Sequence, residues 1–129
     1  MNTTENNKLI AEFMGMSYDY HGQPNKYWEL TDEQSFASNN PYPQDRHLNF
    51  HTSWNWLMEV VERIEALGYS VQPLFNSCYI AKKEGYTYKI KVEQQDKKID
   101  AVYNACVEFI KWYNIEILFK ELEGKGHIV

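Results

Sequence analysis

The spacing of apolar residues along the chain predicts three helices. Apolar side chains recur at intervals of three and four in residues 3–14, 54–67 and 99–113, which is the pattern of a helix that buries one face. The first helix is short, and Gly15 can end it because glycine readily adopts the left-handed conformation that follows many helices.

The middle helix has the clearest pattern. Its apolar stripe consists of Trp54, Leu57, Val60, Val61, Ile64 and Leu67. Gly68 follows the stripe as a stop signal, and Thr52 or Ser53 can accept a hydrogen bond from a backbone N–H at the start of the helix. This interpretation places Trp54 in the core and Trp56 away from the centre of the stripe.

Three strands are expected between the middle and last helices. Residues 69–75, 76–83 and 86–93 are short runs rich in aromatic and β-branched side chains, with turn residues between them. In the third run, alternation places Tyr88 and Ile90 on one face and Lys89 and Lys91 on the other. The lysines indicate that the second face is the wetter one.

Together these elements predict an α+β fold with a single domain over residues 1–129. We expect a small antiparallel sheet of three to five strands, because residues 17–28 can add two short strands to the three above. The sheet packs with two main amphipathic helices and a short N-terminal helix. Residues 31–47 are rich in Asn, Ser and Pro without a period, and predict a long surface loop.

The tail, residues 115–129, is more apolar than a free tail should be. It can continue the last helix to about Glu123, with Gly124 as the stop. The tail therefore either docks on the domain or forms an oligomer interface through residues 115–123.

Composition and charge narrow the classes of function. Aromatic residues make up 16% of the chain, more than so small a core needs, so some rings are expected at the surface. The net charge of −5 makes binding to duplex nucleic acid unlikely. The N-terminus lacks the pattern of a signal peptide, and no apolar run approaches the length of a membrane span. We therefore expect a cytoplasmic protein without membrane contact.

Three stretches resemble a known group of proteins. They are NKLIAEFMGM at 7–16, HTSWNWLMEVVERIEALGY at 51–69 and IDAVYNACVEFIKWYN at 99–114. Together they resemble small proteins of bacterial viruses and prophages, most of all those of Bacteroidetes-type hosts, that look akin to the phage ABA sandwich domain. The resemblance implies a phage or prophage origin, a host-cell location and an α/β sandwich-like fold. It implies no catalytic residues.

We find no constellation that predicts catalysis, a metal or a cofactor. Asp45, His47 and His51 contain metal-binding residue types, but they precede a helix cap, where their side chains are spread apart. Cys78 and Cys106 fall on apolar positions, where a thiol is inert filler. The single, scattered glycines form no phosphate-binding loop.

Aromatic and basic side chains supply the candidate binding residues instead. These are Trp28, Tyr42, His51, Trp56, Tyr79, Lys89 and Lys91. Rings that lie off the core stripes are typical of contact surfaces and can also stack on bases. Two simpler interpretations remain open: the lysines can belong to a solvated sheet face, and the rings can be partly buried under the long loop.

Two hypotheses for function follow. The first is a non-enzymatic accessory protein that binds a host or phage protein and forms homo-oligomers. The second is a small-molecule binder that sequesters a nucleotide signal of host defence, using the Lys89 and Lys91 face or a pocket between subunits. An enzyme ranks third.

Overall fold

The computed structural model describes residues 2–31, 34 and 42–126, and for residues 124–126 it describes the backbone alone. The elements in chain order are α1 (Thr3–Phe13), β1 (Tyr18–Asp19), β2 (Tyr27–Trp28), the 3-10 helix η1 (Asp45–His47), α3 (Trp54–Ala66), β3 (Tyr69–Leu74), β4 (Ser77–Lys82), β5 (Tyr88–Val92) and α4 (Lys98–Gly126). Helices combined with antiparallel strands confirm the predicted α+β class, including its short N-terminal helix.

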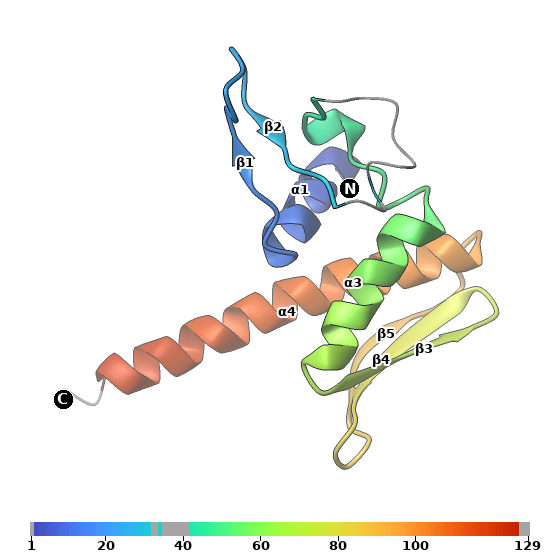
Figure 1. Cartoon of the computed structure of the whole chain (residues 1–129). Helices are drawn as coiled ribbons and strands as arrows, with labels where there is room; N and C mark the ends of the chain where they lie inside the picture. Colours follow the sequence, from blue (N-terminus) through green and yellow to red (C-terminus); the bar gives the residue numbers. More distant parts are fainter. Residues whose placement is uncertain (1, 32–33, 35–41, 127–129) are drawn as a thin grey trace.

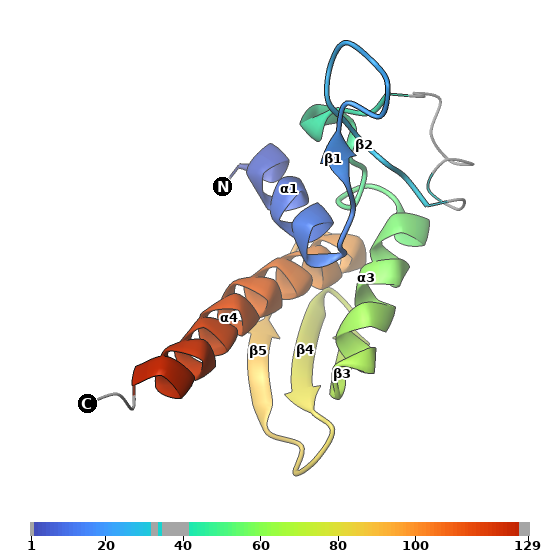
Figure 2. The ribbon, with the colours of Figure 1, turned by 60° about the vertical axis from the view of Figure 1, so that its left-hand side comes forward.

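Helix α4 runs through the middle of the molecule. The three-stranded sheet lies on one side of it, α1 lies on the opposite side, and α3 packs beside it (Figures 1 and 2). Between Ala101 and Ile110 all side chains are buried except those of Asn104 and Glu108. This half of α4 is apolar around most of its circumference because it has neighbours on most sides.

The sheet has the order β3-β4-β5, and both pairs are antiparallel. Val71, Ile80 and Ile90 are in register across the three strands and face the helices, so all three are buried. A register shift between Ile80 and Ala81 interrupts the pairing with β5. The sheet therefore has one covered face, as the alternation in the sequence indicates.

The start of α3 corrects one sequence prediction. The Ser53 hydroxyl accepts a hydrogen bond from the Trp56 amide and caps the helix, as expected. However, Trp54 is 41% exposed and Trp56 is fully buried, the reverse of the prediction. The two rings lie on opposite edges of the buried stripe. Phe50, which precedes the helix and is itself buried, packs edge-on against Trp56 and covers that edge.

The two short strands form a separate ribbon. β1 and β2 pair antiparallel, with Tyr18 opposite Trp28. The ribbon is held to the segment before α3, because Trp28 Nε1 donates to Asp45 Oδ1 at 2.7 Å and the Trp28 amide donates to the Pro43 carbonyl at 2.8 Å. Much of the long loop predicted at 31–47, namely residues 32–33 and 35–41, lies outside the described residues.

The tail extends α4 further than the sequence suggests. The helix continues to Gly126, past the end expected near Glu123, and residues 127–129 lie outside the described part of the chain. Figure 1 shows the last turns projecting away from the other elements. In the described chain the tail does not dock on the domain.

Candidate functional site

The projecting end of α4 carries the largest contiguous group of exposed apolar side chains on any described helix. Ile115, Leu118, Phe119 and Leu122 are 53%, 54%, 58% and 54% exposed. Their spacing places them on one face of the helix, and we refer to these four residues as the α4 stripe. On residue areas of roughly 200 Å² each, the stripe exposes about 450 Å² of apolar surface, which is large for a monomer.

The α4 stripe continues the solvent-facing side of the buried half of the helix. Asn104, Glu108 and Lys111 precede it at intervals of four and three residues, and these three side chains are half-buried or exposed. The outward face of α4 is therefore polar where the helix crosses the domain and becomes apolar where the helix leaves it. Solvent alone does not account for this change, because an outward face in water favours polar side chains throughout.

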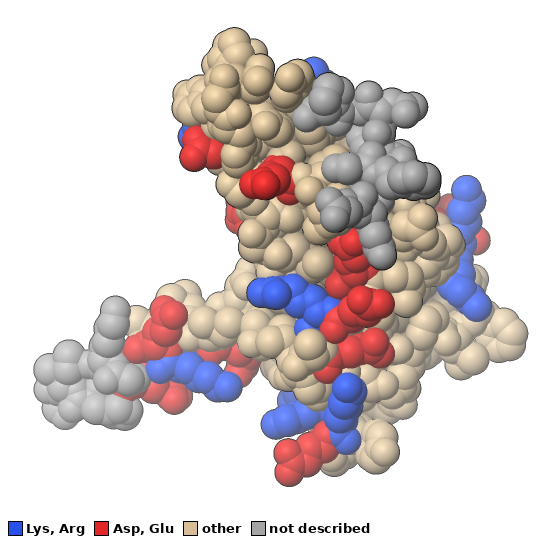
Figure 3. Space-filling model, viewed as in Figure 1, with Lys and Arg blue, Asp and Glu red and all other residues tan. Residues whose placement is uncertain are grey.

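Charged side chains flank the α4 stripe. Glu116 and Glu123 lie along one edge and Glu121 lies near the other, while Lys111 lies in line with the stripe at the end nearest the domain. Figure 3 shows acidic and basic side chains together on this projecting arm. Ile117 is also exposed, at 38%, but its position places it on the opposite side of the helix.

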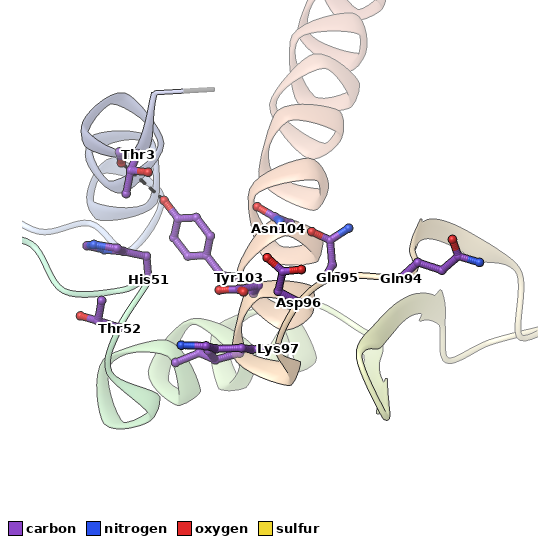
Figure 4. A pocket seen from close by; sticks show the side chains of 11 residues that line it. Thr3, His51, Thr52, Gln94, Gln95, Asp96, Lys97, Tyr103 and Asn104 are labelled. Atoms are coloured by element: carbon purple, nitrogen blue, oxygen red, sulfur yellow. Dashed lines mark hydrogen bonds between the residues drawn. The ribbon is translucent and has the colours of Figure 1, made fainter.

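A polar pocket of about 660 Å³ lies at the other end of α4. Its walls come from the start of α1, the chain before α3, the loop before α4 and the first turns of α4. Figure 4 shows Thr3 and His51 on one side, Gln94 on the other, and Tyr103 between them. The charged lining residues are Asp96, Lys97 and Asp100, so an anionic ligand meets more negative than positive charge.

A buried hydrogen-bond network underlies this pocket. Asn7 is 2% exposed. Its Nδ2 donates to the Leu48 carbonyl at 2.9 Å and lies 3.0 Å from His51 Nδ1, while its Oδ1 accepts from the Tyr103 hydroxyl at 2.9 Å. Burial lowers the pKa of His51 and raises the pKa of Tyr103 to about 12. The network thus links α1, the chain before α3, and α4 through neutral groups.

The local sequence pattern does not predict this network. Asn7 lies inside an amphipathic helix, where asparagine is disfavoured because its amide competes with the backbone for hydrogen bonds. The sequence offers one indication of the network: two consecutive asparagines, Asn6 and Asn7, inside a helix suggest that at least one side-chain amide has a specific hydrogen-bond partner. The partners themselves come from segments 41 and 96 residues away in the chain, which no local pattern reveals.

The outward face of the sheet holds a small aromatic group. The rings of Tyr79 and Tyr88 meet edge-on at 6.0 Å, and the Lys91 ammonium lies 5.8 Å from the centroid of Tyr88. Lys89 does not take part in this group, because its ammonium lies 5.6 Å from the centroid of the Trp112 ring of α4. The predicted strict alternation along β5 is therefore wrong: the irregular register at Ala81 leaves Tyr88 on the face of Tyr79 and separates the two lysines.

A second polar hollow, of about 650 Å³, lies beside the β1–β2 ribbon. Tyr42 is 47% exposed there and packs edge-on against Tyr27 at 5.2 Å. Lys26 and Arg46 also line the hollow. This site is shallow and lies between surface segments.

The structure does not gather the seven candidate binding residues into one site. Trp28 and Trp56 are 2% and 0% exposed, so neither ring offers a contact surface. Trp28 was expected outside the core stripes, but its indole is buried beside the Tyr18 ring, 4.8 Å away, and donates a hydrogen bond to Asp45. The others separate into the ribbon hollow (Tyr42), the polar pocket (His51), the outer sheet face (Tyr79 and Lys91) and the edge of α4 (Lys89).

The thiols and the potential metal ligands offer little chemistry in this structure. Burial raises the pKa of the Cys78 thiol to about 12 and also raises the pKa of Cys106, so the nucleophilic thiolate is scarce at neutral pH. Among the residues that the structure describes, no group of three or more His, Cys, Asp or Glu side chains could hold a metal ion.

Comparison of the chain with protein-family models, curated protein sequences and solved structures gives no significant match. The resemblance to phage proteins therefore stays a prediction. Within the described residues, the helices are too short or too polar to cross a membrane.

Proposed function

We propose that this chain is a non-enzymatic protein-binding module and that the α4 stripe is its binding surface. The observation that carries the proposal is the projection of an apolar helix face beyond the domain, with all four stripe residues more than half exposed. Burial of about 450 Å² of apolar surface corresponds to a gross gain of about 11 kcal/mol. Association costs of similar size reduce the net affinity, so a partner must cover most of the stripe to bind well.

The sequence resemblance makes a host or phage protein the expected partner, met in the cytoplasm of the host cell. An apolar helix face is a common recognition element, because its anchor residues recur at fixed spacing along the helix. The described pockets support a binding role less well, since both are polar and open.

The experiment compares three versions of the tagged chain expressed in host cells. Phe119→Asp places a charge in the α4 stripe, whereas Ile117→Asp makes the same chemical change on the opposite side of the arm. We expect the wild type and the Ile117→Asp variant to retain the same protein in stoichiometric amount, and the Phe119→Asp variant to lose it. Equal retention by all three would exclude the α4 stripe as the binding surface.

A second candidate function is binding of a small aromatic anion on the outer sheet face, for example a nucleotide. The supporting observation is the exposed Tyr88 ring, 49% accessible, with Tyr79 and the Lys91 ammonium beside it. Such a ligand should raise the melting temperature of the wild type and not that of Lys91→Glu. Because Lys89 lies over Trp112, Lys89→Glu is the matched control and should respond as the wild type does.

A further inference from the structure

We propose that the occupant of the α4 stripe is a second copy of this chain, with the two α4 helices parallel and a two-fold axis running between them. This inference rests on the proposed function and names its partner. Trp112, Ile115, Phe119 and Leu122 follow one another at intervals of three, four and three residues. This is the alternating spacing of the core seam in a two-stranded coiled coil.

The seam is accessible to a second helix from Ile115 to Leu122, where its residues are more than half exposed. Trp112 is half-buried at the edge of the domain, where its ring packs edge-on against Tyr69 of β3 at 5.9 Å and lies beneath the Lys89 ammonium. Glu108 and Lys111, on the same side of α4, are also exposed. Figure 2 shows that α1 and the sheet lie on other sides of the helix and end before the arm does. A second helix can therefore approach along the arm from Ile115 onward, and it covers Trp112 only by displacing the Lys89 side chain.

Charge decides the orientation of the two copies. Lys111 flanks the seam on one side, and Glu116 and Glu123 flank it on the other. In a parallel coiled coil, a residue that flanks the seam on one side faces the residue five positions later on the other side of the partner helix. Lys111 of each copy therefore faces Glu116 of the other. In an antiparallel pair like flanks meet, which brings Glu116 of one copy against Glu123 of the other. The parallel pair therefore gains two attractive contacts where the antiparallel pair meets repulsion.

The area of the seam sets the expected affinity. The α4 stripe of each copy, in which Leu118 flanks the seam, exposes about 450 Å² of apolar surface. With the other flanking side chains, the pair buries about 1,000 Å² in total, at the lower limit of specific interfaces. We expect a dimer that dissociates at micromolar concentration and not an obligate one. The acidic flanks oppose an anionic membrane surface as the occupant.

The first experiment is sedimentation of the full chain over about three decades of concentration, starting near 1 µM. We expect a monomer–dimer equilibrium for the wild type and for Ile117→Asp, and a monomer throughout for Phe119→Asp. Circular dichroism confirms that the variants are folded. Lys111→Glu and Glu116→Lys should each weaken the dimer roughly tenfold, and the double variant should recover most of the loss.

Cysteine cross-linking tests the orientation. Residue 115 lies on the two-fold axis of a parallel pair, so Ile115→Cys should form an intermolecular disulfide on mild oxidation. Leu118→Cys should not, because residue 118 flanks the seam and faces away from its counterpart. The native cysteines are buried and do not compete. Cross-linking of Leu118→Cys in place of Ile115→Cys would indicate an antiparallel pair and overturn the proposed orientation.

Failure of this inference is distinguishable from failure of the proposed function. A chain that stays monomeric at every concentration would overturn the second copy as the occupant, and so would a dimer that persists in Phe119→Asp. In the monomeric case, stripe-dependent retention of another protein would keep the proposed function and identify a different protein as the partner. Stripe-dependent binding to phosphatidylcholine vesicles would assign a lipid surface and would likewise overturn the inference.

Discussion

Replacing Asn7 with alanine is expected to destabilise the fold strongly, although the change removes only a small polar group. Asn7 makes three side-chain hydrogen bonds, to Leu48, His51 and Tyr103. Its removal leaves the Leu48 carbonyl without that donor and leaves the Tyr103 hydroxyl with only the Thr3 carbonyl at 3.4 Å. Each buried group that loses its partner costs about 1–3 kcal/mol. Water can reach the half-buried His51, and alanine favours the helix, so we expect a net loss of about 3 kcal/mol.

Asn6 supplies a matched control in the adjacent position. It is 6% exposed, and its Nδ2 has no hydrogen-bond partner within the described structure. Alanine at residue 6 removes an unpaired buried amide and favours the helix, so Asn6→Ala should leave stability unchanged or raise it by up to about 1 kcal/mol.

Urea unfolding at one fixed protein concentration measures both variants, with tryptophan fluorescence as the signal and the free energy of unfolding taken from midpoint and slope. A fixed concentration is necessary because self-association also stabilises the folded state. Equal free energies for Asn6→Ala and Asn7→Ala, or a loss below about 1 kcal/mol for Asn7→Ala, would refute the assignment of the network as a stabilising element.

Three further predictions test other parts of the structure. Burial lowers the pKa of His51 in the folded state, so the stability that the neutral imidazole contributes is present above the unfolded pKa of 6.5 and is lost as the pH falls through the lowered value. Acidification should therefore lower the melting temperature less in His51→Gln than in the wild type. Equal drops in the two proteins would contradict this prediction. Phe75 lies in the β3–β4 turn with a φ of 55°, a left-handed conformation that favours glycine, and its ring is 79% exposed. Phe75→Gly should therefore raise the free energy of unfolding by about 1 kcal/mol. A decrease would show that the exposed ring stabilises the turn. Cys78 and Cys106 are buried, and iodoacetamide should modify them in urea and not in native buffer; rapid native labelling would show that the core opens easily.

The sequence predicts where the helices and strands lie better than it predicts which of their side chains are buried. Helices α1 and α3 and the three-stranded sheet follow from periodicity, because each buries a single face or stripe. Helix α4 follows from its long run of apolar residues at helical spacing, although its first half is buried on most sides. The exchange of Trp54 and Trp56 could not be predicted, because both lie at an edge of the α3 stripe. The choice between them depends on Phe50, which packs on one of these edges. Local periodicity cannot indicate which edge a preceding segment covers.

The candidate site was predictable in part, for the same reason. The apolar character of residues 115–123 is visible in the sequence, and so is the choice between docking and association. Only the three-dimensional arrangement shows that Phe13 of α1 packs on Tyr113 and Tyr69 of β3 packs on Trp112, and that α4 projects beyond α1 and the sheet, so that the stripe meets solvent. The lysine pair was misassigned because a single irregular residue in a strand reverses the side on which its neighbours lie. That irregularity arises from pairing between strands and has no signal in the alternation of β5 itself.

The two halves of α4 connect the core of the protein to its proposed contact surface. The half from Ala101 to Ile110 is fixed by neighbours on most sides, so it supplies an already formed helix onto which the arm can continue without a new nucleation step. The arm itself gains almost nothing from tertiary contacts, since from Asn114 to Glu123 only Glu116 is half-buried. Its helical order then depends on propensity and on whatever covers the stripe. A partner bound there would stabilise the last turns of α4, and the rigid first half would hold that partner at a fixed position relative to the sheet.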